Sequence, residues 1–268
     1  MAKSFKSLLG DDIKNTRTLL HEAIPITGTI SSGTYSDNNV KTFSHGMFQS
    51  VYDYPFLSSS ANHIFDITYG VSAIGSSSAN TQNAKKVNVY NQMAQVLFGY
   101  DVNGGIRSFD SDGTLDDSAG RMDHCYFLNF SRLLSKDEIK KNSFRMGLFQ
   151  SGTVDERNRL VTVGDYDAGN EFRTSPAGDY GLLFSSSLDS SDNSKSIGLL
   201  FYQAGVAVLS SSIFADPNGP RPRQGSTPIE SGDTSTANAT SITNAQRDYT
   251  ISQLADGFRH RLYDIDFN

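Results

Sequence analysis

The sequence predicts a mixed α/β protein of the α+β type, dominated by β-structure: an antiparallel sheet or sandwich covered by one main amphipathic helix, with long irregular arms. Serine, glycine and asparagine are abundant in the 268 residues, and they favour turns over helix interiors. One segment has a strong helical pattern, and the strand pattern is strongest at 197–209. We expect an N-terminal extended arm with an aromatic anchor, a central β-rich domain, a low-complexity Pro/Ser/Thr/Gly arm or loop, and a C-terminal segment returning to the core, at residues 1–60, 61–215, 216–248 and 249–268.

The main helix is expected at 84–99, which lies within the central domain. Four apolar residues recur there at the spacing of one helix face, namely Val89, Met93, Val96 and Leu97. Gly99 follows them, where a left-handed residue often ends a helix. The opposite face carries Lys85 and Lys86. The apolar stripe is therefore expected to lie on a sheet, with the lysines in solvent.

The strongest strand signal is a hairpin from Ile197 to Leu209. Its arms are apolar at nearly every residue, and Gln203-Ala204-Gly205 connects them. Three connecting residues that end in glycine suit a type I turn closed by a left-handed glycine bulge. Both faces should be covered, either by the chain's own helix or by a neighbouring subunit. Further strands are expected at 123–130, 160–163 and 180–184.

Two segments are interpreted as arms that lie mainly against other chains. The low-complexity arm has few large apolar side chains, so it recovers little of the entropy lost on ordering. Arg221 and Arg223 are its candidate contacts with acidic neighbours. The N-terminal arm offers aromatic hot spots, which are Phe43, Phe48, Tyr52, Tyr54 and Phe56. The alternative is that these aromatic residues pack on the domain's own core.

No catalytic, cofactor or metal site is predicted. The five histidines lack metal-ligand spacing, and no phosphate-binding glycine motif occurs. His124 and Cys125 are neighbours in a strand, so they point to opposite faces and do not form a nucleophile–base pair. The acidic stretches 110–117 and 165–170 are interpreted as surface turns. Cation binding by the first stretch and a pair of acids for glycoside hydrolysis are left open.

The amino-acid composition limits the kinds of molecule that we expect the chain to bind. The net charge is −6 with 19% charged residues, so we expect neither nucleic acid nor membrane as a partner. No apolar run reaches the length of a membrane span, and no hydrophobic signal core follows the N-terminus. The single cysteine excludes an internal disulfide framework. These features predict a chain made in a reducing cytoplasm.

Three stretches in this order resemble virion structural proteins of T4-like contractile-tailed bacteriophages, especially marine and cyanobacterial ones. They are 90–101 (YNQMAQVLFGYD), 127–141 (FLNFSRLLSKDEIKK) and 197–209 (IGLLFYQAGVAVL), and the resemblance spans 85–268. It implies a virion protein assembled in the host cytoplasm, whose partners are copies of itself and other virion proteins. It transfers no active residues. Many members continue beyond a segment resembling 258–268, so functions of that extension are expected to be absent or supplied by another chain.

Three functions are compared on this basis. The first is a non-enzymatic structural component of a phage tail, baseplate or neck that holds neighbouring subunits together through its arms. The second is a receptor- or glycan-binding tail module, which predicts an exposed aromatic platform. The third is a tail-associated hydrolase, which requires convergent acids or a nucleophile–base pair. The sequence favours the first.

Overall fold

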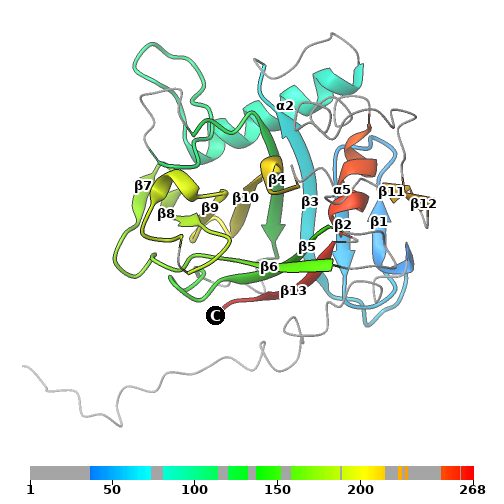
Figure 1. Cartoon of the computed structure of the whole chain (residues 1–268). Coiled ribbons are helices and arrows are strands. Elements are labelled where there is room, and N and C mark those ends of the chain that lie inside the picture. Colours follow the sequence, from blue (N-terminus) through cyan, green and yellow to red (C-terminus); the bar gives the residue numbers. More distant parts are fainter. Residues whose placement is uncertain are drawn as a thin grey trace, which may run out of the picture.

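The computed structural model of the chain has three layers, which are visible in Figure 1. A helix lies on one face of a large antiparallel sheet, and a small sheet with a second helix lies on the other. The expected α+β, β-dominated fold is confirmed. The structure describes residues 37–73, 81–113, 120–131, 137–151, 158–187, 189–214, 223–224, 227–228, 249–259 and 261–268.

The large sheet has eight strands in the order β1-β2-β3-β4-β10-β9-β8-β7, and every neighbouring pair is antiparallel. The three-residue strands β1 and β7 form its two edges. The strands are β1 (Val40–Thr42), β2 (Gln49–Tyr52), β3 (His63–Val71), β4 (His124–Phe130), β7 (Arg173–Ser175), β8 (Gly178–Leu183), β9 (Gly198–Phe201) and β10 (Val206–Ser210). The short 3₁₀ helices are η2 (Asp37–Asn39), η3 (Asn193–Lys195) and η4 (Ser211–Phe214).

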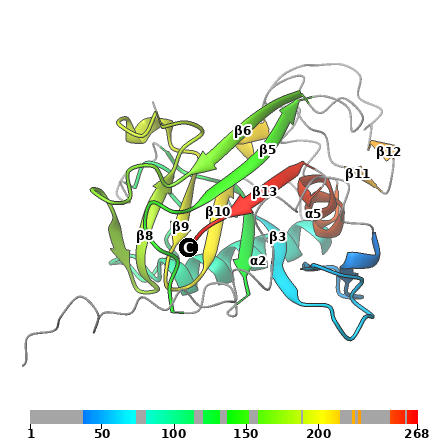
Figure 2. The same ribbon diagram turned by 90° about the horizontal axis from the view of Figure 1, so that it is seen from below.

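The small sheet has the order β13-β5-β6 and packs on the large sheet (Figure 2). Its strands are β5 (Arg145–Ser151), β6 (Asn158–Gly164) and β13 (Leu262–Asp266). Phe130 of β4 contacts Phe144 and Phe267 at ring distances of 5.8 and 5.0 Å. Helix α5 (Ile251–Arg259) covers the same face, with Phe258 5.0 Å from Tyr126. Aromatic side chains thus join these layers.

Helix α2 (Thr81–Leu97) covers the opposite face of the large sheet. Its approach to β3 depends on Gly70, where an added Cβ would lie 2.8 Å from the backbone nitrogen of Tyr90. The Tyr90 ring contacts Phe109 and Phe127 edge-on at 5.3 and 6.5 Å. The helix therefore rests directly on backbone at one point and on aromatic rings around it.

The expected left-handed end of α2 is confirmed, since Gly99 has a φ of 75°. The expected orientation is confirmed for Val89, Met93 and Leu97, which lie on the core side, but it is wrong for Val96 and Lys86. Lys86 is fully buried, whereas Val96 is 67% exposed. The contact face consists of Asn83, Lys86, Val89, Tyr90, Ala94 and Leu97. This face keeps Val89 and Leu97 of the expected stripe and extends it to Lys86, Tyr90 and Ala94.

The expected hairpin is confirmed as β9 and β10, and Gly205 has a φ of 66°. Both arms are buried almost throughout. Phe98, beyond the end of α2, contacts Phe201 at 5.4 Å on one face. In the described part of the chain, the hairpin is therefore covered by other layers of the same chain. The other expected strands are confirmed as β4, β6 and β8.

The expectation that all of 1–60 is an arm is wrong for residues 37–60. Strands β1 and β2 belong to the large sheet, and Val51 of β2 is fully buried between Val40 and Phe65. Backbone hydrogen bonds with β3 and the burial of Val51 attach this segment to the sheet. Residues 1–36 lie outside the described residues.

The C-terminal segment packs on the core through α5 and β13, as expected for 249–268. Most of 216–248 lies outside the described residues. Its described pieces are the paired strands β11 (Arg223–Gln224) and β12 (Thr227–Pro228). Strand β11 lies against α5, so this part contacts its own chain, contrary to the arm interpretation.

Candidate functional site

An aromatic cluster lies beside the edge strand β1 and consists of Phe43, His45 and Phe48. The Phe43 and His45 rings stack at 5.3 Å with an interplanar angle of 6°. Phe48 lies 4.7 Å from Phe43 and 5.1 Å from His45. Lys41 of β1 places its ammonium group 5.0 Å above the Phe43 ring. The cluster is therefore a partly exposed aromatic surface with a cation at its border.

The other predicted aromatic residues lie along β2 and the loop after it. Tyr52 is half-buried, and its ring lies 6.5 Å from Phe56 and 5.5 Å from His63. Tyr54 is 58% exposed, and the neighbouring Leu57 is 87% exposed. None of the five predicted aromatic residues is a buried core residue. The alternative that they pack on the core is therefore wrong, and the structure divides them between two surface groups.

The two predicted basic contacts cannot be placed. Arg221 lies outside the described residues. Arg223 belongs to β11, but its side chain lies outside what the structure describes.

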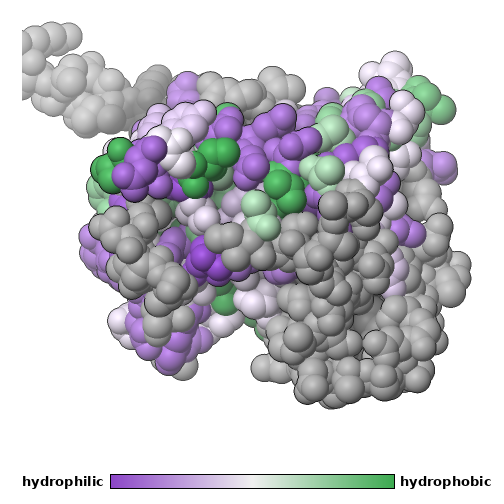
Figure 3. Space-filling view, turned by 90° about the horizontal axis from the view of Figure 1, so that it is seen from above, coloured by the Kyte–Doolittle hydropathy of each residue, from purple (hydrophilic) through white to green (hydrophobic). Residues whose placement is uncertain are grey.

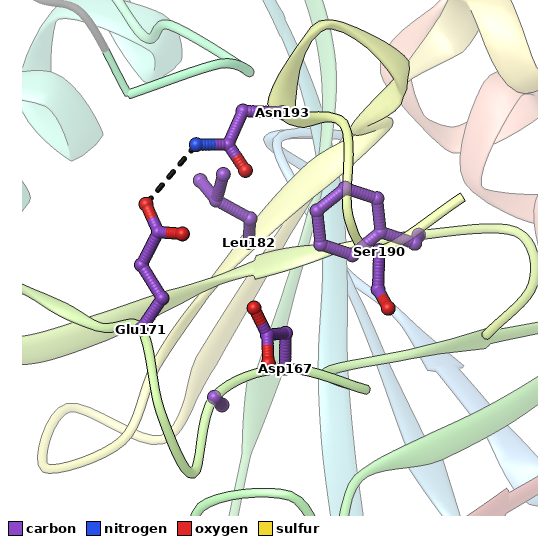
Figure 4. A pocket seen from close by; sticks show the side chains of 7 residues that line it. Asp167, Glu171, Leu182, Ser190 and Asn193 are labelled. Atoms are coloured by element: carbon purple, nitrogen blue, oxygen red, sulfur yellow. Dashed lines mark hydrogen bonds between the residues drawn. The ribbon is translucent and has the colours of Figure 1, made fainter. Parts of the chain in front are cut away.

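A small pocket of about 10 Å³, enough for about one water molecule, lies at the opposite end of the large sheet (Figure 4). Leu182 of β8 and the neighbouring Phe184 form its apolar floor. Asp167 and Glu171 come from the connection between β6 and β7. The remaining lining residues are Ala168, Ser190 and Asn193. No pattern in the sequence indicates this pocket, because its lining comes from three separate segments.

The two carboxylates of this pocket differ in their partners. Glu171 Oε1 accepts hydrogen bonds from Arg173 Nη2 and Asn193 Nδ2, each at 3.0 Å. Asp167 Oδ1 accepts one from Asn170 Nδ2 at 3.1 Å. Among the described residues Asp167 has no ion pair. The pocket therefore places an almost fully buried apolar floor beside a carboxylate that forms no ion pair with a described residue.

His124 and Cys125 point to opposite faces of β4, as expected. His124 Nδ1 and the Tyr69 hydroxyl lie 2.9 Å apart on the α5 side. Cys125 is fully buried on the α2 side, opposite Gly70, and its thiol donates to the Met122 carbonyl at 3.4 Å. Burial raises the pKa of the Cys125 thiol well above its usual value. A buried thiol of this kind is a poor nucleophile.

The first acidic stretch forms a tight turn at Asp110, which is only 3% exposed. Its Oδ1 accepts hydrogen bonds from the backbone nitrogens of Asp112 and Gly113 at 3.0 and 3.1 Å. Burial, followed by the neighbouring Asp112, raises the pKa of Asp110 to about 7. Residues 114–119 lie outside the described residues. The described part of the chain contains no group of three potential metal ligands.

The second acidic stretch was expected to be a surface turn, and for Asp165 this is wrong. Asp165 is fully buried. Its carboxylate accepts hydrogen bonds from the backbone nitrogens of Asn142 and Phe144 at 2.7 and 3.0 Å, from Arg145 Nη1 at 3.1 Å and from the Tyr202 hydroxyl at 3.2 Å. Burial is the main cause that raises the pKa of Asp165. This carboxylate links structural elements and does not line the pocket at β8.

The face that carries α2 is mainly hydrophilic, with a few hydrophobic patches (Figure 3). Val96 of α2 is 67% exposed, and Tyr100 and Val102, in the loop after it, are 57% and 95% exposed. The exposed aromatic residues Tyr54, Tyr100 and Phe172 lie in three different loops, and Tyr263 lies in β13.

Comparisons of the chain with protein-family models, with curated proteins and with solved structures found no match. In the described part of the chain, neither helix is long and apolar enough to cross a membrane.

Proposed function

We propose that the chain is a non-enzymatic structural component of a tailed-phage virion, in the tail, baseplate or neck, which holds neighbouring subunits together. The observation that carries this proposal is the edge strand β1 with its aromatic cluster. An open sheet edge offers backbone donors and acceptors to another chain. Partly exposed aromatic rings beside it supply apolar contact area. Together they suit protein–protein contact better than chemistry.

Three described groups that could perform chemistry have internal partners, which also supports a structural role. Asp165 accepts four hydrogen bonds inside the protein. His124 lies at hydrogen-bond distance from Tyr69, and the Cys125 thiol is buried. These contacts stabilise layers of the fold, and they leave none of these groups beside the described pocket.

The three phage-like stretches occupy the centre of the fold. They include the second half of α2, most of β4 and the hairpin of β9 and β10. Segments at these places determine how the layers pack. Their central position supports the proposal that the chain shares a scaffold with those virion proteins and acts in assembly. For residues 1–36 and 229–248, contact with other virion proteins remains part of the proposal.

The proposal is tested on tailed-phage particles purified from lysates of the host in which the gene is expressed. Quantitative mass spectrometry should find the chain in a fixed ratio to the tail proteins through a density gradient and a high-salt wash. Recovery of the chain only in the free soluble fraction would contradict the proposal.

A glycan-binding tail module is the second candidate, and the stacked pair of Phe43 and His45 favours it. Stacked rings at a surface can support the apolar face of a sugar. Binding of the purified chain to a glycan array, with loss of binding in Phe43→Ala, would establish this function instead. Equal binding by the Lys140→Ala control is required, because Lys140 is exposed and lies in a different part of the fold.

A further inference from the structure

We propose that copies of this chain associate through the two edge strands of the large sheet, so that β1 of one copy pairs with β7 of the next and the sheet continues between them. This inference rests on the proposed structural function and names the partner of the β1 edge as a second copy. The two surfaces are the β1 edge, Val40–Thr42, and the β7 edge, Arg173–Ser175.

The topology places these strands at opposite ends of one sheet (Figure 1). Among the described strands, β1 has the single neighbour β2 and β7 has the single neighbour β8. The sheet has eight strands and every neighbouring pair is antiparallel, so β1 and β7 run in opposite directions. A second copy in the same orientation beside the first therefore continues the antiparallel order. Strand addition at sheet edges is a common way to join chains.

The β7 edge has a donor and an acceptor that point outward. Residues in an antiparallel pair alternate between those that bond to each other and those that point away from each other. The carbonyl of Asp179 accepts from the nitrogen of Tyr202 at 3.0 Å, so Asp179 points away from β7. Thr174 lies opposite Asp179, and its N–H and C=O therefore point to the other side. No backbone hydrogen bond from another described segment reaches them.

The same alternation identifies the outward groups of the β1 edge. The carbonyl of Ile64 accepts from the nitrogen of Ser131 at 2.8 Å, so Ile64 points towards β4 and the next residue of β3 points towards β2. Followed across β2, this order makes Ser50 bond to Lys41. Thr42 comes directly after Lys41, so its N–H and C=O point outward. Thr42 and Thr174 are both exposed and can exchange two hydrogen bonds between copies.

The faces of the sheet restrict the register of this pairing. Lys41 is on the same face as Asp66 two strands away, and alternation along β3 puts Asp66 on the α2 face with Gly70. Arg173 lies opposite Tyr180, whose ring contacts the aromatic ring that follows α2. Lys41 and Arg173 are therefore both on the α2 face. Opposite residues share a face, so Lys41 must lie opposite Arg173 or the residue two positions away from it.

Charge selects between these two registers. Lys41 opposite Arg173 would place like charges side by side, which is destabilising. The other register pairs Thr42 with Thr174 and places Phe43 opposite Arg173. In this arrangement the two outward-pointing threonines bond to each other, and the aromatic cluster beside β1 receives a cation from the next copy.

A carboxylate also lies where the cation of the β1 edge would arrive. Lys41 Nζ is 5.0 Å above the Phe43 ring, so the lysine side chain extends towards the end of β1 that meets the start of β7. Glu171 precedes β7 at that end, and its side chain is 46% exposed. Both hydrogen bonds that Glu171 accepts from described residues use Oε1. Its Oε2 is therefore directed to pair with Lys41 of the neighbouring copy.

A contact between two different surfaces is heterologous, so it does not stop at a dimer by symmetry. Repetition of the contact gives either a closed ring or an open filament. This is the kind of association that a tail, baseplate or neck component needs. A contact between two β1 edges would instead be isologous and would end at a dimer.

The first test blocks one edge at a time with proline. Thr42→Pro and Thr174→Pro each remove one outward N–H, and proline is tolerated in an edge strand where the N–H does not bond within the sheet. Thr42→Val and Thr174→Val are the matched controls, because they lose the same hydroxyl and keep the N–H. Circular dichroism and thermal melting confirm that the four variants fold.

Sedimentation velocity over a concentration series measures the association. The wild type and both valine controls should form species larger than dimers. Each proline variant alone should associate at least about tenfold more weakly, which corresponds to about 1.4 kcal/mol. An equimolar mixture of the two proline variants should give heterodimers and nothing larger, because it contains one intact β1 edge and one intact β7 edge.

The second test is a double-mutant cycle for the ion pair, and it decides the register even where a proline variant does not fold. Lys41→Ala and Glu171→Gln should each weaken the association, and the glutamine keeps an oxygen that accepts from Arg173 and Asn193. The double variant should associate about as weakly as either single one, because both remove the same contact. Unchanged association in both single variants, or losses that simply add, would overturn the register.

A wild type that remains monomeric, a mixture of proline variants without heterodimers, or an effect of proline at only one of the two edges would overturn the inference. Failure of the proposed function is distinguishable. A chain that enters purified particles but gives no heterodimers refutes only the contact between β1 and β7. Heterodimers from a chain that is absent from purified particles refute only the virion role.

Discussion

The hydroxyl of Tyr202 donates a hydrogen bond to Oδ2 of Asp165 at 3.2 Å, and both side chains are fully buried. Tyr202 begins the turn between β9 and β10 of the large sheet, whereas Asp165 follows β6 of the small sheet. The same carboxylate also accepts from the backbone nitrogens of Asn142 and Phe144 just before β5. One carboxylate therefore links the turn between β9 and β10 of the large sheet to the end of β6 and to the residues just before β5 in the small sheet.

Replacement of Asp165 by alanine should strongly destabilise the protein. The backbone nitrogens of Asn142 and Phe144 and the Tyr202 hydroxyl would lose their acceptor, at about 1–3 kcal/mol for each buried group left unsatisfied. We expect the free energy of unfolding to fall by about 3–5 kcal/mol in urea denaturation. Tyr202→Phe should cost only about 1 kcal/mol. Equal losses in the two variants would show that Asp165 acts only through Tyr202.

Gly181→Ala should destabilise the protein through the same tyrosine. A Cβ at this position would clash with the hydroxyl oxygen of Tyr202. Overpacking of this kind costs about 1–3 kcal/mol. In a Tyr202→Phe background the added cost should be smaller, because the obstructing oxygen is gone. Gly169→Ala is the control, since no atom lies within 4 Å of its added Cβ. A full penalty in both backgrounds would contradict this explanation.

Asp110 should make stability depend on pH. Its pKa is raised to about 7 by burial and by Asp112, above the value of about 4 in an unfolded chain. The folded state therefore binds the proton more tightly, so this contribution is fully present below pH 4 and is lost as the pH rises towards 7.

The measurement for Asp110 compares unfolding of the wild type and Asp110→Asn across this pH range. The variant cannot ionise at this position, so it should lose less stability between pH 4 and 7 and be the more stable protein at pH 8. Parallel pH profiles for the two proteins would contradict the raised pKa.

The thiol of Cys125 should be unreactive in the folded protein. It is fully buried, and burial raises its pKa well above the usual value. We expect no reaction with Ellman's reagent at pH 8 in native buffer, and one equivalent of released thiolate in guanidinium chloride. Rapid native reaction would show that β4 opens or that the thiol is accessible. Cys125→Ala should leave particle infectivity unchanged, in agreement with a structural role.

Local signals predicted much of the fold. Gly99 and Gly205 both have the left-handed conformation expected from their positions after apolar segments. The hairpin around Gly205 was predicted because both of its arms are continuously apolar. These features depend on residues close together in the chain, so one sequence is enough to identify them.

Other features depend on contacts that are distant in sequence. The sequence around Asp165 predicts a surface turn, and only the fold reveals that Tyr202 and Phe144 surround this residue. The hydropathy pattern predicts that Lys86 faces solvent, because hydropathy alone does not indicate which helix face packs on the sheet around Gly70. The pocket with Asp167 was missed for the same reason, since its floor comes from β8.

Hydrogen exchange of the chain alone and within purified particles tests the assembly role most directly. In the isolated chain, the amides of β1 should exchange rapidly, whereas those of the central strand β4 should be protected. In the particle, β1 and the loop with Tyr54 and Leu57 should become protected, and β4 should be unchanged. Equal exchange of β1 in the two states would contradict the account.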